Sequence, residues 1–134
     1  MTHVHFIEVR FADTDAAGHV NNAAYATYGE AGRIAFLEAV GLDVAALILA
    51  RIEIDFRRQL RFGDEVGVES SVERVGNSSV TVRQTVRADG EVAAELRSVV
   101  VNYDYDAQRS VRLPEAARDK LQAYLVKPPP SPAS

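Results

Sequence analysis

The chain has 134 residues and a mass of 14.6 kDa, with 47% hydrophobic residues, 25% charged residues and a formal net charge of -4. A chain of this length folds as one domain, its acidic balance gives no support to a nucleic-acid partner, and its apolar runs are far shorter than the roughly 20 residues that span a bilayer. Cysteine is absent, which excludes disulfides, thiolate metal sites and cysteine nucleophiles. Because no signal-peptide pattern opens the chain either, we expect a cytoplasmic protein.

The first predicted element is a strand over residues 3–11, which are rich in β-branched and aromatic types. Residues 12–21 follow without a hydrophobic period and contain Asp13, Asp15 and Gly18. This composition is typical of a loop.

A long helix is predicted over residues 22–40. Asn21 or Asn22 can cap its start through a side-chain oxygen, and Gly41 stands where a left-handed residue commonly ends a helix. Apolar side chains cover most of its circumference, which is typical of a buried helix.

Two glycines lie inside this predicted helix. Gly29 and Gly32 each cost about 1 kcal/mol relative to alanine at such a position. We therefore expect them to allow a close approach between the helix and a sheet. Glu30 and Arg33 have the spacing of an i,i+3 surface pair.

The second half of the chain is predicted to be mostly strand, because apolar and polar residues alternate there. The Asp89-Gly90 pair is a strong signal for a two-residue hairpin turn. The last three strands should therefore form an antiparallel meander. The predicted strands cover residues 51–57, 65–75, 79–88 and 91–103.

Pro114 can open a short terminal helix over residues 115–124, and the Pro-rich residues 127–134 are expected to be extended or disordered. The sequence thus predicts a single domain over residues 1–126 and a tail. Its fold class is α+β, with an antiparallel sheet of about five strands wrapped around one long buried helix. Exposed sheet edges favour pairing with a second copy.

The loop before the long helix carries the side chains suited to chemistry. A helix N-terminus presents free N–H groups and about half a positive charge, which would stabilise the oxyanion that develops on an acyl carbonyl. A carboxylate such as Asp15 could attack that carbonyl or activate a water. This arrangement needs no metal and no cofactor.

The pattern D-x-D-x-x-G-x-x-x-N-x-x-Y over residues 13–25, followed by Glu30 and Arg33, resembles the hotdog-fold acyl-CoA thioesterases of the 4-hydroxybenzoyl-CoA thioesterase family. The resemblance implies a hotdog fold, hydrolysis of an acyl-CoA thioester without a cofactor, and a homodimer or homotetramer. It continues in three later segments: I-D-F-R-R-Q-L-R-F-G-D-E-V (54–66), V-V-V-N-Y-D (99–104) and R-L-P-E-A-A-R (112–118).

The resemblance also implies roles for individual residues. The nucleophile or general base falls on Asp15, and the backbone N–H that polarises the thioester carbonyl falls near Asn22. The acyl group is expected to run along the helix beside Tyr25. The residues expected to bind substrate are Gly18, Tyr25, Arg57, Arg58 and Arg61.

His19 departs from the family pattern, because that position is often apolar in its members. Its side chain can hydrogen-bond the loop or orient Asp15 or a water, which makes it a further catalytic candidate. Asp13 is expected to be structural. Two other functions stay open: a non-catalytic module that binds acyl thioesters, and a hotdog dehydratase, which usually pairs a histidine with a carboxylate. The sequence does not distinguish CoA from an acyl carrier protein.

Overall fold

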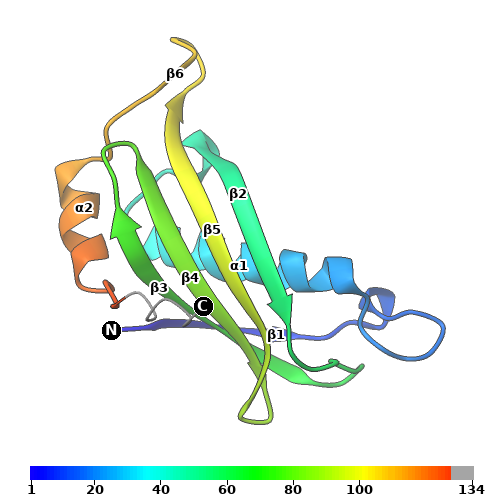
Figure 1. Ribbon diagram of the computed structural model, residues 1–134. Coiled ribbons are helices and arrows are strands. Elements are labelled where there is room, and N and C mark those ends of the chain that lie inside the picture. Colours follow the sequence, from blue (N-terminus) through cyan, green and yellow to red (C-terminus); the bar gives the residue numbers. More distant parts are fainter. Residues whose placement is uncertain (128–134) are drawn as a thin grey trace, which may run out of the picture.

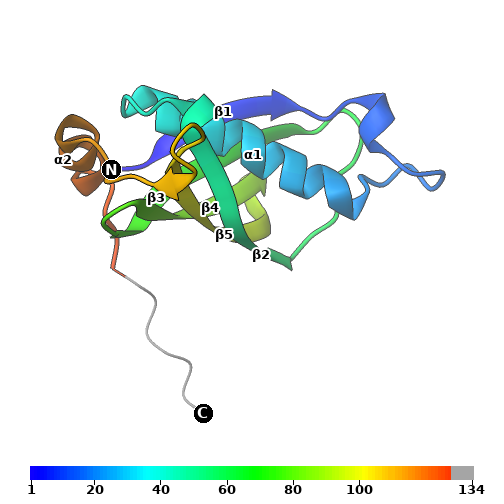
Figure 2. The ribbon, with the colours of Figure 1, turned by 90° about the horizontal axis from the view of Figure 1, so that it is seen from above.

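A computed structural model describes residues 1–127 of the protein, and the predicted Pro-rich tail lies outside these residues apart from Lys127. An antiparallel six-stranded sheet in the order β1-β3-β4-β5-β2, with β6 paired to β5, curls around the long helix α1 (Figures 1 and 2). The predicted α+β arrangement is confirmed. The elements are β1 (His3–Glu8), α1 (Asn22–Ala39), β2 (Leu47–Phe56), β3 (Glu65–Val75), β4 (Ser79–Ala88), β5 (Glu91–Asp104), β6 (Arg109–Ser110) and α2 (Glu115–Gln122).

The boundaries differ from the prediction by more than one residue at two strands. β1 ends at Glu8, and a short 3₁₀ helix occupies Phe11–Asp13. β2 begins at Leu47 rather than at residue 51. Its first residues, Leu-Ile-Leu-Ala, form an apolar run, so the alternation that marks a strand is missing there. The hairpin at Asp89-Gly90 is confirmed, since both residues have the positive φ, 53° and 75°, that a type I′ turn requires.

The glycines of α1 allow the close approach that the sequence predicted. A Cβ atom at Gly32 would lie 2.4 Å from Cγ1 and 2.8 Å from Cβ of Val68 on β3. A Cβ atom at Gly29 would lie 2.4 Å from Cδ2 of Leu96 on β5. Alanine fits at neither position unless these neighbours shift, so α1 lies directly on the sheet.

A polar layer divides the core into two hydrophobic clusters, one under each half of α1. On β3, β4 and β5, one polar residue of this layer lies between an apolar residue of the first cluster and an apolar residue of the second. Gln84 links the layer to the helix, because its Nε2 donates to the carbonyl of Gly29 at 2.9 Å and to Oγ of Ser70 at 3.0 Å. The buried polar residues of the layer are Arg33, Ser70, Gln84 and Ser98.

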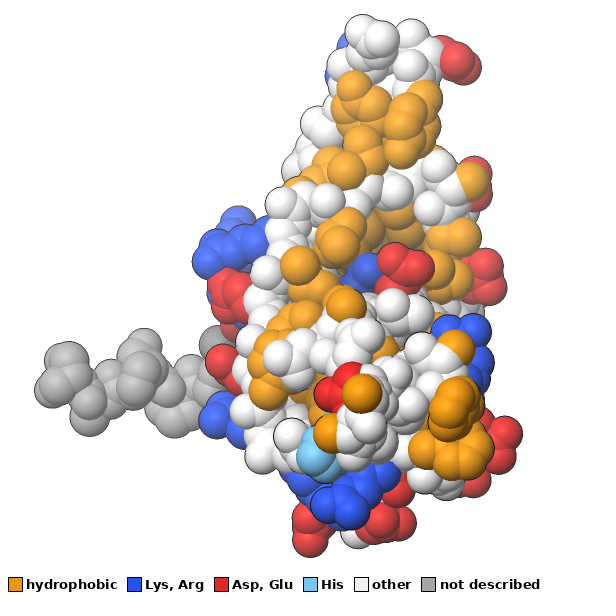
Figure 3. Space-filling model, turned by 90° about the vertical axis from the view of Figure 1, so that its right-hand side faces the viewer, with side chains coloured by type: hydrophobic (Ala, Val, Ile, Leu, Met, Phe, Trp, Pro, Cys, Tyr) orange, Lys and Arg blue, Asp and Glu red, His pale blue; other side chains and the backbone are white. Residues whose placement is uncertain are grey.

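α1 is buried where it faces the sheet, as predicted, but one of its faces is not covered by the single chain. Glu30 and Ile34 lie on an exposed face of the helix, beside the edge strand β2. β2 also leaves Leu49, Ile52 and Phe56 exposed, with Phe56 at 47%. Figure 3 shows hydrophobic side chains gathered on this side of the molecule. Within residues 1–127, neither helix has both the length and the apolar character needed to cross a membrane.

Candidate active site

The loop before α1 folds back on itself as a tight hairpin. The N–H of Asn21 donates to the carbonyl of Asp13 at 2.9 Å, and the N–H of Asp15 donates to the carbonyl of His19 at 2.8 Å. Gly18 forms the turn with a φ of +81°, a conformation that glycine adopts without strain. Both ribbon views show this hairpin projecting beyond the start of α1 (Figures 1 and 2).

Asp15 is exposed, and its carboxylate is held from one side only. Oδ1 accepts the N–H of Ala17 at 2.9 Å and the N–H of His19 at 3.2 Å. Oδ2 has no hydrogen-bond partner within residues 1–127. The turn therefore orients the carboxylate and leaves its second oxygen free. Among the described residues, no hydrogen bond joins Asp15 to the first turn of α1.

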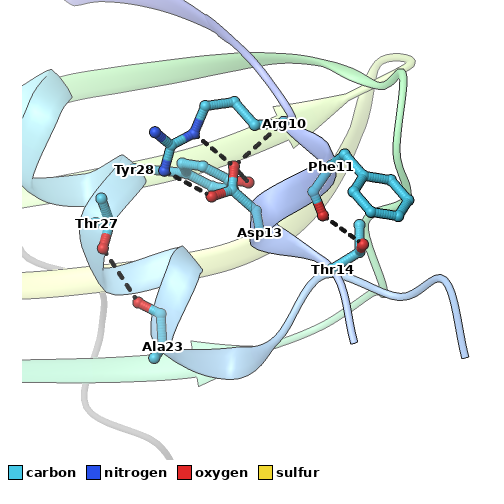
Figure 4. Close-up of polar contacts among 7 residues, drawn as sticks. All are labelled: Arg10, Phe11, Asp13, Thr14, Ala23, Thr27 and Tyr28. Atoms are coloured by element: carbon cyan, nitrogen blue, oxygen red, sulfur yellow. Dashed lines mark hydrogen bonds and ion pairs between the residues drawn. The ribbon is translucent and has the colours of Figure 1, made fainter. Parts of the chain in front are cut away.

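Asp13 fastens the hairpin to the body of the protein and is buried. Its carboxylate accepts the backbone N–H of Arg10 at 3.0 Å, Nη2 of Arg10 at 2.9 Å and the hydroxyl of Tyr28 at 2.7 Å (Figure 4). The Arg10 side chain, followed by the Tyr28 hydroxyl, holds the pKa of Asp13 down at about 2. Asp13 therefore has the structural role that the sequence predicted, while only Oδ1 of Asp15 is engaged in the hairpin.

The first turn of α1 offers a free backbone donor. Asn21 is the N-cap, because its side-chain oxygen accepts the N–H of Ala23 at 2.9 Å. The N–H of Asn22, the first residue of the helix, donates to no acceptor among residues 1–127. The partial positive charge of the 18-residue helix is concentrated at this end. An anionic oxygen is therefore stabilised here.

Tyr25 ties the segment that follows β2 to the start of α1. Its buried hydroxyl donates to the carbonyl of Arg58 at 2.8 Å and accepts the N–H of Leu60 at 2.9 Å. The N–H of Val20 donates to the carbonyl of Leu60, also at 2.9 Å. Tyr25 packs edge-on against Phe56, with ring centroids 5.2 Å apart. The hydroxyl is thus occupied by the backbone, and the ring is buried in the core, since Tyr25 is only 2% exposed.

The three predicted basic residues differ in their surroundings. Arg57 pairs with Glu95 at 3.0 Å, and Arg58 pairs with Glu91 at 3.3 Å. The guanidinium of Arg61 makes no ion pair or hydrogen bond within the described residues. The backbone of Arg61 forms a β-bridge with His19, which brings Arg61 to the hairpin. The structure therefore brings Arg61 to the hairpin that contains Gly18 and His19, and it leaves the side chains of Arg57 and Arg58 paired with glutamates.

One polar residue of α1 is buried rather than paired at the surface. The spacing of Glu30 and Arg33 allows a surface pair, but Arg33 is buried and makes no ion pair with Glu30 within 4.0 Å. A signal was present, because Arg33 shares a helical stripe with Gly29, Gly32 and Phe36, which all face the sheet.

Comparison with known proteins places these features in a family. The family model described as the thioesterase-like superfamily matches residues 9–121. The chloroplastic acyl-acyl carrier protein thioesterase ATL3 of Arabidopsis thaliana is 29% identical over 93% of this chain and 71% of its own length. The long-chain acyl-CoA thioesterase FadM of Escherichia coli is 27% identical over 89% of this chain and 96% of its own length.

Solved structures agree with this grouping. A predicted thioesterase from Bacillus stearothermophilus superposes with a TM-score of 0.88 at 31% identity, covering 96% of this chain and 99% of that one. A thioesterase from Thermus thermophilus, in complex with coenzyme A and zinc, superposes with a TM-score of 0.83 at 35% identity. The second match covers 93% of this chain and 95% of the other.

Proposed function

This chain belongs to the thioesterase-like superfamily, and from that premise we propose that it is an acyl-CoA thioesterase, which hydrolyses the bond between an acyl group and the sulfur of CoA. The observation that carries the proposal is the match of residues 9–121 to this family, together with relatives named as thioesterases of acyl carriers. The Thermus thermophilus structure that contains coenzyme A supports CoA as the carrier. The Arabidopsis thaliana relative makes acyl carrier protein the carrier to test beside it.

The oxyanion site of the proposed reaction is the start of α1. The free N–H of Asn22 supports this role, since it can donate to the carbonyl oxygen of the thioester. Attack on that carbonyl places negative charge on the oxygen, and the positive end of the helix stabilises it.

Asp15 is the proposed nucleophile or general base. As a nucleophile, Oδ2 forms a bond to the acyl carbon, the carbon–sulfur bond breaks and the CoA thiolate leaves, and water then hydrolyses the mixed anhydride. As a general base, Oδ2 takes a proton from a water whose oxygen attacks the acyl carbon directly, the carbon–sulfur bond breaks and the CoA thiolate leaves. The two N–H groups on Oδ1 support both routes, because they orient Oδ2 before substrate binds.

Substrate binding is assigned to the surroundings of the same helix start. Gly18 and His19 would line the entrance, and the acyl chain would run past Tyr25, whose ring is buried in the wall behind it. Arg61 is the best candidate for a CoA phosphate, because no carboxylate of the described residues pairs with it. Arg57 and Arg58 would bind phosphate only by exchanging their present glutamate partners.

A homodimer or homotetramer is part of the proposal. The hairpin that holds Asp15 projects from the single chain (Figure 1), so a second subunit would enclose it. The edge strand β2 offers unpaired backbone groups and the exposed side chains of Ile52 and Phe56 to such a subunit. Light scattering of the purified protein measures the number of subunits.

The test of the proposed activity is a thiol-release assay over short, long and aromatic acyl-CoAs, repeated with the same acyl groups on acyl carrier protein. Release of free thiol from at least one acyl-CoA is the expected result. Binding without thiol release across the panel would instead favour a non-catalytic module. Analysis of the acyl product completes the test, since a change in unsaturation without thiol release would indicate a dehydratase.

The two routes for Asp15 predict different products in water labelled with oxygen-18 under single-turnover conditions. If Asp15 is the nucleophile, attack of labelled water on the anhydride at its aspartyl carbon leaves the label in the protein. If Asp15 is the general base, the label enters only the released acid. Label in the peptide that contains Asp15, detected by mass spectrometry, identifies the nucleophilic route. Label in the acid alone leaves the general-base route or hydrolysis of the anhydride at its acyl carbon.

A further inference from the structure

A buried arginine without a carboxylate partner lies at the middle of α1. Arg33 is only 5% exposed, and Nη1 donates to Oγ of Ser98 on β5 at 3.3 Å. No carboxylate of the described residues lies within 4.0 Å of its guanidinium. Glu30, one turn earlier, lies on the exposed face of the helix.

This environment leaves most of the hydrogen-bonding capacity of Arg33 unused. A guanidinium has five N–H donors, and a buried charge is costly unless it is paired. Burial lowers the pKa of Arg33, and the charge of Glu30 opposes that change only in part. An anion that reaches Arg33 would pair with the buried guanidinium and offset the cost of its burial.

Arg33 lines a cavity of about 160 Å³ between α1 and β2. Glu30, Ile34 and Leu49 are exposed at the rim, so the cavity opens to solvent there. Apart from Glu30 and Arg33, the lining is aliphatic and includes Leu47 and Val100. At roughly 30 Å³ per water-sized group, it can hold a carboxylate and the methylene groups next to it.

We propose that this cavity is an acyl subsite in which Arg33 binds a carboxylate at the end of the acyl group remote from the thioester. The preferred substrates are then CoA monothioesters of dicarboxylic acids. This inference rests on the proposed function, because it takes the start of α1 as the position of the thioester.

The geometry of α1 sets the length of the acyl group. Arg33 follows Asn22 by eleven residues, which is about 16 Å along the helix axis. A long acyl chain is needed to span that distance, and its methylene groups would lie on the aliphatic wall. The planar guanidinium can bind the terminal carboxylate through two parallel hydrogen bonds. Glu30 opposes the anion weakly, because solvent and salt screen its exposed charge.

The test compares kcat/KM for CoA monothioesters of dicarboxylic acids with kcat/KM for monocarboxylic acyl-CoAs of equal chain length. We expect the wild-type protein to prefer a long carboxylated chain by at least tenfold, and Arg33→Met to abolish or reverse this preference. Arg33→Lys, which keeps the charge but loses the two-pronged geometry, should be intermediate. The matched control is Arg109→Met, which removes an exposed arginine of β6 and should keep the wild-type ratio.

Three results would overturn the inference. The first is a wild-type preference for the apolar chain, and the second is a preference for the carboxylated chain that Arg33→Met leaves unchanged. The third is a loss of subunit association in Arg33→Met with no change in selectivity, since Arg33 would then serve a partner subunit. If no acyl-CoA is hydrolysed, the proposed function fails, and calorimetric binding of a free long-chain dicarboxylate decides the inference by itself. Binding weakened at least tenfold in Arg33→Met supports the inference, and equal binding contradicts it.

Discussion

Asp13 and Asp15 are two residues apart, and the structure predicts that replacing Asp13 lowers stability. The surroundings of Asp13 lower its pKa from an ordinary 3.8 to about 2, which corresponds to about 2 kcal/mol at 1.36 kcal/mol per pKa unit. Solvent screens part of this energy, because the Arg10 side chain is 71% exposed. We therefore expect Asp13→Asn to lower the free energy of unfolding by about 1–2 kcal/mol at pH 7.

The pH dependence of this loss follows from the direction of the pKa change. Because the folded state lowers the pKa of Asp13, its stabilisation is complete above about pH 4 and disappears as the pH falls through about 2. Urea unfolding of the wild type and of Asp13→Asn should thus differ at pH 7 and converge near pH 2. The control is Asp15→Asn, whose exposed amide oxygen can still accept the same turn N–H groups. Equal stabilities at pH 7, or a difference that persists near pH 2, would refute this reasoning.

Three further predictions concern packing, anchoring and substrate affinity. Gly32→Ala should destabilise the protein by about 1–3 kcal/mol, because the branched Val68 cannot move aside. Gly29→Ala should destabilise it less, because only the end of the Leu96 side chain must shift. Urea unfolding measures both losses, and a larger loss for Gly29→Ala would contradict the packing argument. Tyr25→Phe removes the acceptor of the buried Leu60 N–H and should lower the free energy of unfolding by about 1–3 kcal/mol in the same assay. An unchanged unfolding curve would show that this N–H finds another partner. Arg61→Gln should raise KM for acyl-CoA severalfold with little change in kcat, and the effect should shrink at high salt; an unchanged KM would remove Arg61 from the CoA site.

Most of the fold could be predicted from local patterns. The Asp89-Gly90 turn and the alternation in β3 and β4 are short-range signals, and the structure confirms both strands at their predicted bounds. The start of β2 was missed, because a strand that opens on an apolar run has no alternation to mark it. The exposed face of α1 was missed for a different reason. Composition shows that a helix is apolar, but it does not show whether its own chain or another one covers it.

The candidate site was predictable only as far as sequence neighbours are also spatial neighbours. The hairpin from Asp13 to Asn21 and the cap on α1 are local, so the motif indicated them. The burial of Arg33 depends on β5, more than sixty residues away in the sequence, where Ser98 meets it. Arg57 and Arg58 were grouped with Arg61 because they are adjacent in sequence. Their pairing with Glu95 and Glu91 arises from the register between β2 and β5, which the sequence alone does not specify.

The proposed catalytic role of Asp15 is measured most directly by kcat of Asp15→Asn. Thiol release should be followed at saturating acyl-CoA for the wild type and the variant, with unfolding curves recorded on the same preparations. We expect kcat to fall by about a hundredfold or more while the free energy of unfolding stays within about 0.5 kcal/mol of the wild-type value. A folded Asp15→Asn protein that releases thiol at the wild-type rate would contradict the assignment.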